Sequence, residues 1–546
     1  MIHLQRNTPP IDEHVPFTYS DFSGGLNNKT ELKLNQARDL LNMSFLSDLR
    51  VGKRTGVYKD EDFIATFHDI TFIDRYYRQG TRQWNTVYAD KDRFCVDIKI
   101  YNIPNVTMGV GYKDQYFFVN GEAIWVMDGL LTVRKMVNPP AGFTPAPSPA
   151  TIGIWVNDDS VNPKERWYEP CQLELDSTEL GTNLIPDGPT IIALKEGRLY
   201  VSGVDSDPNN VYISDLDNGF YWPVALPLQA PPNGEKVTCL YEFMNTMVIG
   251  RENSIYAIYG NTNIPDSGDD LFRVKSIQTH AGIINSKCVA RMHNYMVFVG
   301  SDGIVYYMIT PLTDVRYFTT KVLSKDVDLF KEPLGFTYEQ IEECFATFSN
   351  NEYLLSINDK TLIYNYVEQA WTVYDVNVAS MLSYNDELKF TLKGATGFYK
   401  FREHGHVDAY RDVIKINFTN DIENNAINSY WTSLRDDFGN ATYFKHFREI
   451  FLVVSTFKNY ISNVDVNFEI DYIDVGNLIT IADKIAVWGR AVFGDRLLDK
   501  DISVSLPTQI GRRGRFLSFT VSNNSIDQPL VLHEMSGDYI LRGRRK

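Results

Sequence analysis

Cysteine is scarce in this chain of 546 residues, and the few cysteines stand far apart. No Cys-x-x-Cys pair occurs among them. A zinc knuckle needs closely spaced Cys or His ligands, and a disulfide scaffold needs many cysteines in a short chain. The sequence therefore supports neither structure. The five cysteines are Cys95, Cys171, Cys239, Cys288 and Cys344.

Long apolar runs are also missing. No stretch approaches the roughly 18 to 20 uninterrupted apolar residues of a membrane-spanning helix. The opening segment, MIHLQRNTPP, has one arginine and no apolar run behind it, unlike a secretory signal. We expect a chain without a signal peptide or a transmembrane segment, assembled in a cytoplasm.

The motifs of common enzyme classes are absent. The sequence has no G-x-S-x-G, no H-E-x-x-H, no P-loop and no G-x-G-x-x-G that opens a helix. Its 69 acidic residues supply many carboxylate pairs, so a glycosidase pair can be neither excluded nor picked out. We predict no enzymatic activity and no cofactor.

Basic residues are outnumbered by acidic ones, 53 against 69, which leaves a net charge of −16. A protein that grips nucleic acid by neutralising phosphates normally has the opposite balance. A negative surface suits DNA that must slide past without sticking, and it equally suits plain solubility. The length alone predicts at least two domains.

Aromatic residues are abundant, with 32 Tyr and 32 Phe, and they favour strands. Modules of alternating apolar residues and polar turns recur about every 50 residues, a spacing typical of propeller blades. We predict a mainly β protein with a β-propeller of about six or seven blades. Clear modules begin at Ile191, Val237, Cys288, Cys344, Thr107 and Ala379, and a weaker one begins at Asp69.

Three cysteines occupy nearly equivalent places in the first strand of their modules: Cys239, Cys288 and Cys344. The module at Ile191 has Ala193 in the same place. A crowded inner strand requires small apolar side chains, and free cysteine behaves as one. We interpret these cysteines as core residues.

The pattern divides the chain into three parts. Residues 1–60 form an N-terminal arm with a short helix, in which Asn35 is the N-cap and Ala37, Leu40 and Leu41 share one face. Residues 61–410 form the propeller, with a loop-rich, proline-rich excursion at about 136–189. Residues 411–546 carry longer alternating strands, which predict a C-terminal β-sandwich.

Two loops in the third module have possible structural or metal-binding roles. Ser214–Trp222, SDLDNGFYW, comes within one residue of the Asp-box hairpin, which staples blades and carries no catalytic residue. The oxygen-bearing side chains of Asp205–Asn209 have the spacing found at the start of a calcium-binding loop. However, Asn210 stands where that loop requires glycine, and Leu216 stands where it requires a bidentate glutamate. The sequence favours a solvated loop there and leaves calcium open.

Other polar clusters are less specific. His404 and His406 share one face of a strand, but two imidazoles cannot hold a metal. Basic residues gather at Gly511–Arg515 and Leu541–Lys546. These groups suit DNA phosphate, an acidic neighbouring subunit or, at the end of the chain, a solvated tail.

The order DFSGGLNNK, LNQARDLLNMSF and VGKRTGV within residues 21–57 resembles the amino termini of virion proteins from short-tailed bacteriophages. YISDLDNGFYW and YWTSLRDDFGN with FKHFREI are similar to recurrent elements of the same proteins. Thr55 departs from the family, which often has proline after Lys-Arg. The family is the tail nozzle or tail-hub β-propeller protein, similar to tail tubular protein B.

This resemblance implies a structural virion protein in a ring of six copies at the distal end of the tail, through which the genome leaves. Its implied partners are copies of itself, adaptor or connector ring proteins, and tail fibres or spikes. Phage DNA would pass through the channel without sequence-specific binding, and the host envelope would be met at infection. The arm residues expected to make assembly contacts are Phe22, Gly24, Gly25, Leu26, Leu40, Leu41 and Arg54.

Two other functions stay open. A virion β-propeller adhesin or fibre protein would bind host-surface glycan, and it would need no export signal because lysis releases it. A propeller glycosidase would need two carboxylates in the central funnel of the propeller, which sequence cannot place. The arm and the missing signal peptide favour the tail ring.

Overall fold

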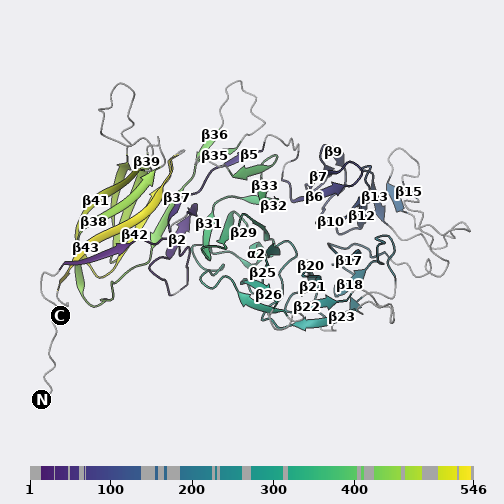
Figure 1. Ribbon diagram of the computed structural model, residues 1–546, viewed down its shortest axis with the longest axis horizontal. Helices are drawn as coiled ribbons and strands as arrows, with labels where there is room; N and C mark the ends of the chain where they lie inside the picture. The colour runs from purple at the N-terminus through teal and green to yellow at the C-terminus, as the bar shows by residue number, and fades with distance from the viewer. Residues whose placement is uncertain are drawn as a thin grey trace, which may run out of the picture.

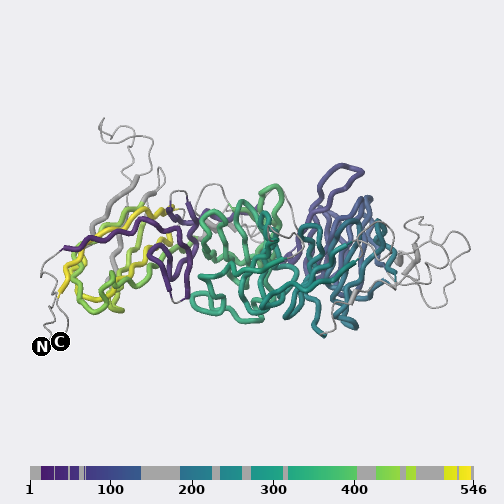
Figure 2. The backbone as a smooth tube through the Cα atoms, turned by 60° about the horizontal axis from the view of Figure 1, so that its bottom comes forward, coloured from purple at the N-terminus to yellow at the C-terminus, as the bar shows by residue number. Residues whose placement is uncertain are grey.

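The computed structural model of this protein is built almost wholly from β-strands, with a β-propeller at one end and a β-sandwich at the other (Figure 1). The second view shows the two parts side by side in an elongated molecule (Figure 2). The structure describes residues 14–29, 31–46, 49–60, 67, 69–136, 154–157, 165–168, 185–223, 228–229, 234–260, 272–310, 318–401, 407–410, 423–456, 462–481, 502–525 and 528–542.

Seven sheets form the blades, antiparallel except where β35 pairs parallel with β5 in blade 7, which confirms the propeller, including the weak module predicted at Asp69. Blades 1 to 4 are β6 (Phe72–Arg78), β7 (Gln83–Ala89), β8 (Phe94–Val96) and β9 (Lys99–Tyr101); β10 (Met108–Tyr112), β11 (Gln115–Val119), β12 (Ile124–Met127) and β13 (Val133–Met136); β16 (Ile191–Lys195), β17 (Arg198–Ser202), β18 (Asn210–Ile213) and β19 (Leu228–Gln229); and β20 (Val237–Phe243), β21 (Thr246–Arg251), β22 (Ile255–Tyr259) and β23 (Arg273–Ile277).

Blades 5 and 6 have four strands each, and a short helix, α2 (Tyr338–Glu342), precedes blade 6. Blade 7 takes its strands from both ends of the propeller segment. The strands of these blades are β24 (Ala290–Met292), β25 (Tyr295–Val299), β26 (Val305–Ile309) and β27 (Thr319–Val322); β28 (Phe345–Ser349), β29 (Glu352–Ile357), β30 (Lys360–Asn365) and β31 (Ala370–Tyr374); and β32 (Val378–Tyr384), β33 (Glu387–Leu392), β34 (Tyr399–Phe401), β5 (Val57–Lys59), β35 (Val407–Tyr410) and β36 (Glu423–Ala426).

The propeller closes into a ring through its innermost strands and through β5. The first strand of blade 7, β32, contacts the first strand of blade 1, β6. Strand β5 comes from the amino-terminal side of blade 1, yet it pairs antiparallel with β34 of blade 7. Opening the ring therefore requires breaking a strand pair as well as separating two blades.

In blades 4 and 6 the hairpin turns between the first two strands have the left-handed backbone expected of tight two-residue hairpins. Met244 and Asn245 have φ of 48° and 61°, and Asn350 and Asn351 have φ of 50° and 63°. Asparagine tolerates this region better than most residues do. These are the polar turns that the repeat pattern predicts.

Two short strands lie in the excursion that the sequence predicts to be loop-rich. They are β14 (Ile154–Asn157) and β15 (Glu165–Tyr168), and they extend the sheet of blade 2 beyond β13. Their aromatic and β-branched residues suit strands. The proline-rich connector, residues 138–153, lies outside the described residues.

The sandwich has two sheets, and the arm contributes strands to both. The predicted division at residues 60 and 410 stays a prediction. One sheet holds β3 (Met43–Phe45), β4 (Val51–Lys53), β43 (Val531–Arg542), β38 (Phe444–Thr456) and β41 (Ile502–Gly514), with β1 (His14–Tyr19) paired to β43; the other holds β2 (Ala37–Leu41), β37 (Ser429–Ser433), β42 (Leu517–Asn523), β39 (Ser462–Ile470) and β40 (Ile473–Ile481).

The helix predicted in the arm is wrong, because its residues form strand β2. Leu40 pairs with Trp431 of β37, and its side chain is buried between the sheets. Asn35 caps no helix; its side-chain amide donates to Asp21 (2.9 Å). Pairing with a strand nearly 400 residues away outweighs the helical spacing of the leucines, since local propensity is worth only about 1 kcal/mol per residue.

A single apolar core runs from the sandwich through the arm into blades 4, 5 and 6. It contains Phe22 and Leu26 of the arm, Trp431 and Phe519 of the sandwich, and Trp371 of β31. Domains move against each other by default unless their interface is large and hydrophobic. The shared core therefore makes the sandwich and these blades one rigid unit. Among the described residues, no helix has the length and apolarity that a membrane crossing requires.

We predict that the buried cysteines resist a bulky thiol reagent until the protein unfolds. Cys95, Cys239, Cys288 and Cys344 are free and buried, and burial raises the pKa of the Cys239 thiol well above its ordinary value. Thiolate is the reactive form, so burial restricts access to all four thiols and also suppresses ionisation of Cys239.

The measurement uses an aromatic disulfide reagent on a Cys171→Ser variant, because Cys171 lies outside the described residues. We expect no rapid release of chromophore in the native protein and four equivalents in denaturant. Rapid reaction of two or more native thiols would contradict the strand register of the blades.

Candidate functional site

The arm lies along the outer edge of the propeller, on strand β31 of blade 6, and also contacts blade 7 and the segment between blades 5 and 6. The hydrogen bonds begin at Leu26, whose amide donates to the carbonyl oxygen of Trp371 (2.8 Å). Gly25 has φ of +65°, and a Cβ there would lie 2.5 Å from that same carbonyl oxygen. At Gly24 a Cβ would lie 2.7 Å from the carbonyl oxygen of Asn35. The glycine pair is thus required by close backbone approach.

Asn42 is the main polar link between arm, propeller and sandwich. It is fully buried with φ of 54°, and its amide donates to Val373 of β31 (2.7 Å). Its side-chain oxygen accepts from Arg54 Nε (2.7 Å), and its side-chain nitrogen donates to the carbonyl oxygen of Asn428 (2.7 Å). One asparagine thereby joins three segments of the chain. Sequence analysis gave it no site role, although it ends the LNQARDLLN motif.

Arg54 is buried, with 1% of its side chain exposed, and pairs with Asp375 (3.2 Å). Its guanidinium lies 5.6 Å from the ring centre of Tyr374. Breaking a buried ion pair leaves an uncompensated charge, so this arginine is costly to replace.

The loop before β2 forms hydrogen bonds with the segment between blades 5 and 6. Asn28 donates to the carbonyl oxygen of Asp328 (2.8 Å) and accepts from its amide (2.7 Å). Lys29 Nζ donates to the carbonyl oxygen of Ser324 (2.9 Å), and Gln36 donates to the carboxylate of Asp326 (3.1 Å). The arm is therefore held by side-chain contacts beyond the paired strands.

The residues expected to make assembly contacts lie mostly inside the chain. Six of the seven are buried or fitted against backbone, and Leu41 is half-buried. Phe22, for example, has no exposed surface and packs edge-on against Trp431 at 5.0 Å between ring centres. Their contacts join the parts of one subunit. Contact with another subunit stays a prediction.

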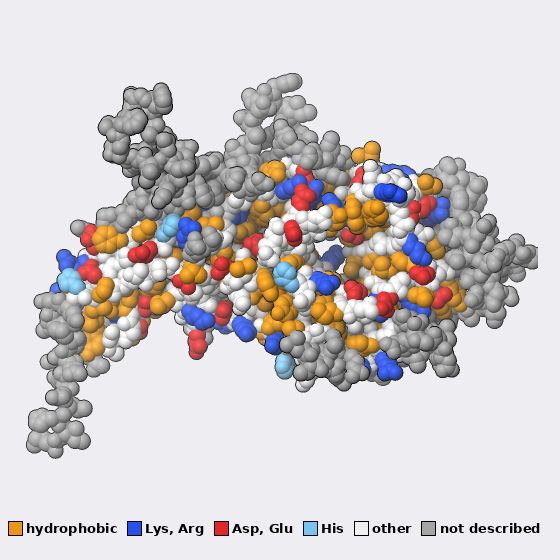
Figure 3. Space-filling view, in the orientation of Figure 1, with side chains coloured by type: hydrophobic (Ala, Val, Ile, Leu, Met, Phe, Trp, Pro, Cys, Tyr) orange, Lys and Arg blue, Asp and Glu red, His pale blue; other side chains and the backbone are white. Residues whose placement is uncertain are grey.

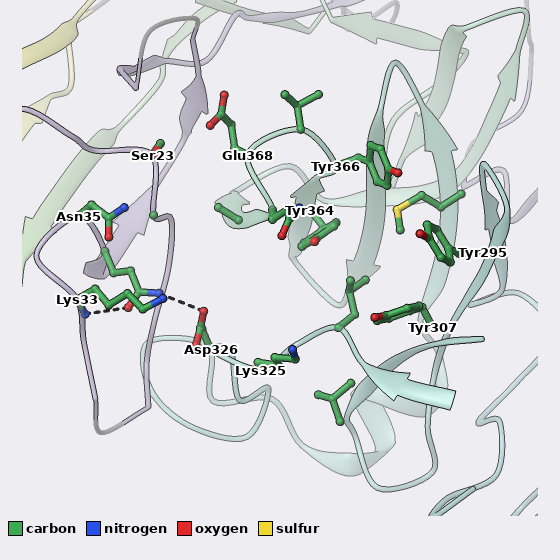
Figure 4. A pocket seen from close by; sticks show the side chains of 18 residues that line it. Ser23, Lys33, Asn35, Tyr295, Tyr307, Lys325, Asp326, Tyr364, Tyr366 and Glu368 are labelled. Atoms are coloured by element: carbon green, nitrogen blue, oxygen red, sulfur yellow. Dashed lines mark hydrogen bonds between the residues drawn. The ribbon is translucent and has the colours of Figure 1, made fainter. Parts of the chain in front are cut away.

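A pocket of about 730 Å³ lies between the arm and blades 5 and 6. Four tyrosines line it: Tyr295 of β25, Tyr307 of β26, Tyr364 of β30, and Tyr366 just after β30. In Figure 4 the arm residues Ser23, Asn35 and Lys33 face these tyrosines from the opposite side, with Lys325 and Asp326 below. Burial raises the pKa of Tyr364 to about 12, so its hydroxyl stays protonated at neutral pH.

A second pocket, of about 500 Å³, lies on the other side of the arm, between blades 6 and 7. Glu352 and Glu387 both line it. Burial raises the pKa of Glu352 to about 7, whereas the hydrogen bond from Lys400 lowers the pKa of Glu387. Carboxylates with pKa values pushed apart are a common feature of acid–base catalysis, but ion pairs within a structure also produce them.

The Asp-box-like hairpin has the structural role predicted for it. Trp222 is buried and its indole donates to the carbonyl oxygen of Gly219 (3.1 Å). Asp217 accepts from the hydroxyl of Tyr112 in the neighbouring blade (2.5 Å). The hairpin thus joins blades 2 and 3.

The calcium-like loop satisfies its own carboxylate: Asp207 accepts from the side chains of Asn210 and Tyr212 (2.5 and 2.7 Å). Within the described ranges, no group of three or more His, Cys, Asp and Glu side chains could hold a metal ion. His404 and His406 lie outside the described residues. Of the basic groups, Arg512, Arg513 and Arg515 are exposed at the end of β41.

We predict that Gly25→Ala destabilises the protein by about 3 kcal/mol, because a left-handed backbone and a backbone clash add together. Gly80→Ala is the matched control, since a Cβ there meets nothing within 4 Å. Chemical unfolding monitored by tryptophan fluorescence gives both values. Equal stability of the two variants would contradict the close packing of the arm on β31.

A second prediction concerns Glu352, whose pKa is raised from 4.5 to about 7. Between these values the folded state holds a proton that the unfolded state has lost, so the free energy of unfolding falls as the pH rises through this window. We expect Glu352→Gln to be more stable than the wild type by about 2–3 kcal/mol at pH 8, and by much less at pH 5.

Unfolding both proteins at the two pH values isolates this carboxyl from other titrating groups. A difference between wild type and variant that does not change with pH would show that Glu352 titrates normally.

The chain matches no protein-family model and no curated protein. Among solved structures it is similar to the WD40 domain of Pan2 from Neurospora crassa, with a TM-score of 0.34 and 8% identity over 64% of this chain and 96% of that chain. The N-terminal domain of Nup159 gives 0.34 and 10% over 64% and 95%. An exo-beta-1,3-galactanase from Phanerochaete chrysosporium gives 0.22 and 9% over 65% and 97%. At these scores the likenesses carry no functional conclusion, and the propeller fold rests on its strand pairing.

Proposed function

We propose that this protein is a structural subunit of a short bacteriophage tail, forming the nozzle or hub ring at its distal end. The observation that supports the proposal is the position of the residues behind the sequence resemblance. Gly24–Gly25, Asn42 and Arg54 belong to the shared motifs; Gly24 fixes the fold of the arm, and the other three join the arm to the propeller. Because these residues fix how the parts of the chain are arranged, the resemblance in sequence supports a similar arrangement of domains.

A rigid subunit suits a ring that conducts DNA. A closed ring repeats one heterologous contact at every interface, so an angular error in each subunit would accumulate around it. The apolar core that the sandwich shares with blades 4 to 6 opposes hinge motion between them. On the face shown in Figure 3, acidic and basic side chains are interspersed. The proposed partners are copies of the chain, an adaptor ring, and fibres or spikes.

The glycosidase alternative has one feature in its favour, the carboxylates of the second pocket. Glu387, however, pairs with Lys400, which also contacts Asp60 (3.2 Å). Glu352 accepts only a long hydrogen bond, from Asn365 (3.5 Å). We interpret Lys400, Glu387 and Asp60 as an ion-pair cluster that holds β5 against blade 7.

The test is cryo-electron microscopy of tails from particles that contain this protein. We expect density for a propeller and an adjoining sandwich, repeated six times around the tail axis at its distal end. Immunogold labelling with an antibody to the chain is the control for identity. Label on fibres alone, or no label on particles, would contradict the proposal.

Deleting the arm cannot serve as this test. Residues 1–57 contain four strands of the sandwich and the first residue of β5, so their loss would disrupt folding as well as assembly.

A further inference from the structure

We propose that the pocket lined by Tyr295, Tyr307, Tyr364 and Tyr366 is a binding site for a short oligosaccharide. The inference does not depend on the proposed tail function. It rests on the aromatic wall, the polar groups opposite it and their balanced charge.

The aromatic wall presents ring faces at several angles. Tyr295 meets Tyr307 nearly edge-to-face, with ring centres 5.3 Å apart, and lies 6.4 Å from Tyr366. Tyr364 is supported from behind by Trp371 at 5.1 Å. Except for Tyr364, which is mostly buried, these rings are half-exposed. A pyranose has apolar C–H faces, which pack well on such rings.

Several polar groups in the pocket have no hydrogen-bond or ion-pair partner within the described chain. The hydroxyls of Tyr307 and Tyr364 make no hydrogen bond with the rest of the described chain, and Lys33 Nζ, Lys325 Nζ and the Glu368 carboxylate form no ion pair there. Opposite the tyrosines, Figure 4 shows Lys33 and Asn35 directed from the arm. Ligand sites typically combine an apolar wall with a few polar groups of this kind.

The charged side chains in the pocket disfavour both cationic and polyanionic ligands. Lys33 and Lys325 would repel a cation that the tyrosines could otherwise surround. Asp326 and Glu368 would repel a polyanion such as nucleic acid. A neutral ligand with apolar faces and many hydroxyls, each able to donate and accept, fits both restrictions. The volume of about 730 Å³ leaves room for more than one sugar ring.

The experiment titrates the full chain with three trisaccharides: maltotriose, chitotriose and a galacturonic acid trimer. Saturation-transfer NMR detects binding and calorimetry measures it. We expect saturable binding of a neutral sugar, and weaker or no binding of the acidic one. Tyr307→Ala and Tyr366→Ala should each weaken binding at least tenfold, whereas Tyr307→Phe should weaken it less because the ring remains.

Tyr338→Ala is the control, because Tyr338 is exposed on α2 and lies outside the pocket. Circular dichroism and the unfolding midpoint check that every variant is folded. Absence of saturable binding for all three sugars, or equal binding by Tyr307→Ala and Tyr338→Ala, would overturn the proposal. Neither result would bear on the ring, which is tested on particles.

Discussion

The structure depends on hydrogen bonds made by the first sixty residues of the chain to strands that lie hundreds of residues later. Strand β1 pairs with β43, β2 pairs with β37, and β5 pairs with β34. Each pair satisfies backbone groups that would otherwise form an exposed sheet edge. The same short segment therefore completes both sheets of the sandwich and closes the propeller, so neither part is finished until the arm is in place.

Because the arm lies along the outer edge of the propeller, it also forms part of two pockets. Its loop forms one wall of the tyrosine pocket, and its last residues form part of the carboxylate pocket. Neither pocket would exist on a propeller alone. The polar link through Asn42 fixes the arm at the position where these walls meet.

The propeller could be predicted from the repeat pattern, because strand alternation and turn residues are local signals. The polar turn at Met244–Asn245, for example, lies between two alternating strands and is a tight hairpin in the structure. The arm could not be predicted in this way. Its spacing of Ala37, Leu40 and Leu41 is helical in isolation, and only the distant partner strand β37 makes it extended. The tyrosine pocket was missed for a similar reason: residues 23 to 370 meet there only after folding.

The most direct test of this account is hydrogen exchange of the native protein, followed by mass spectrometry. If the arm completes both parts, amides of residues 37–59 should exchange as slowly as those of β37 and β43, and lose protection together with them as denaturant is added. Exchange of residues 37–59 well before those partner strands, with the propeller and sandwich still protected, would show that the arm is an accessory and would contradict the account.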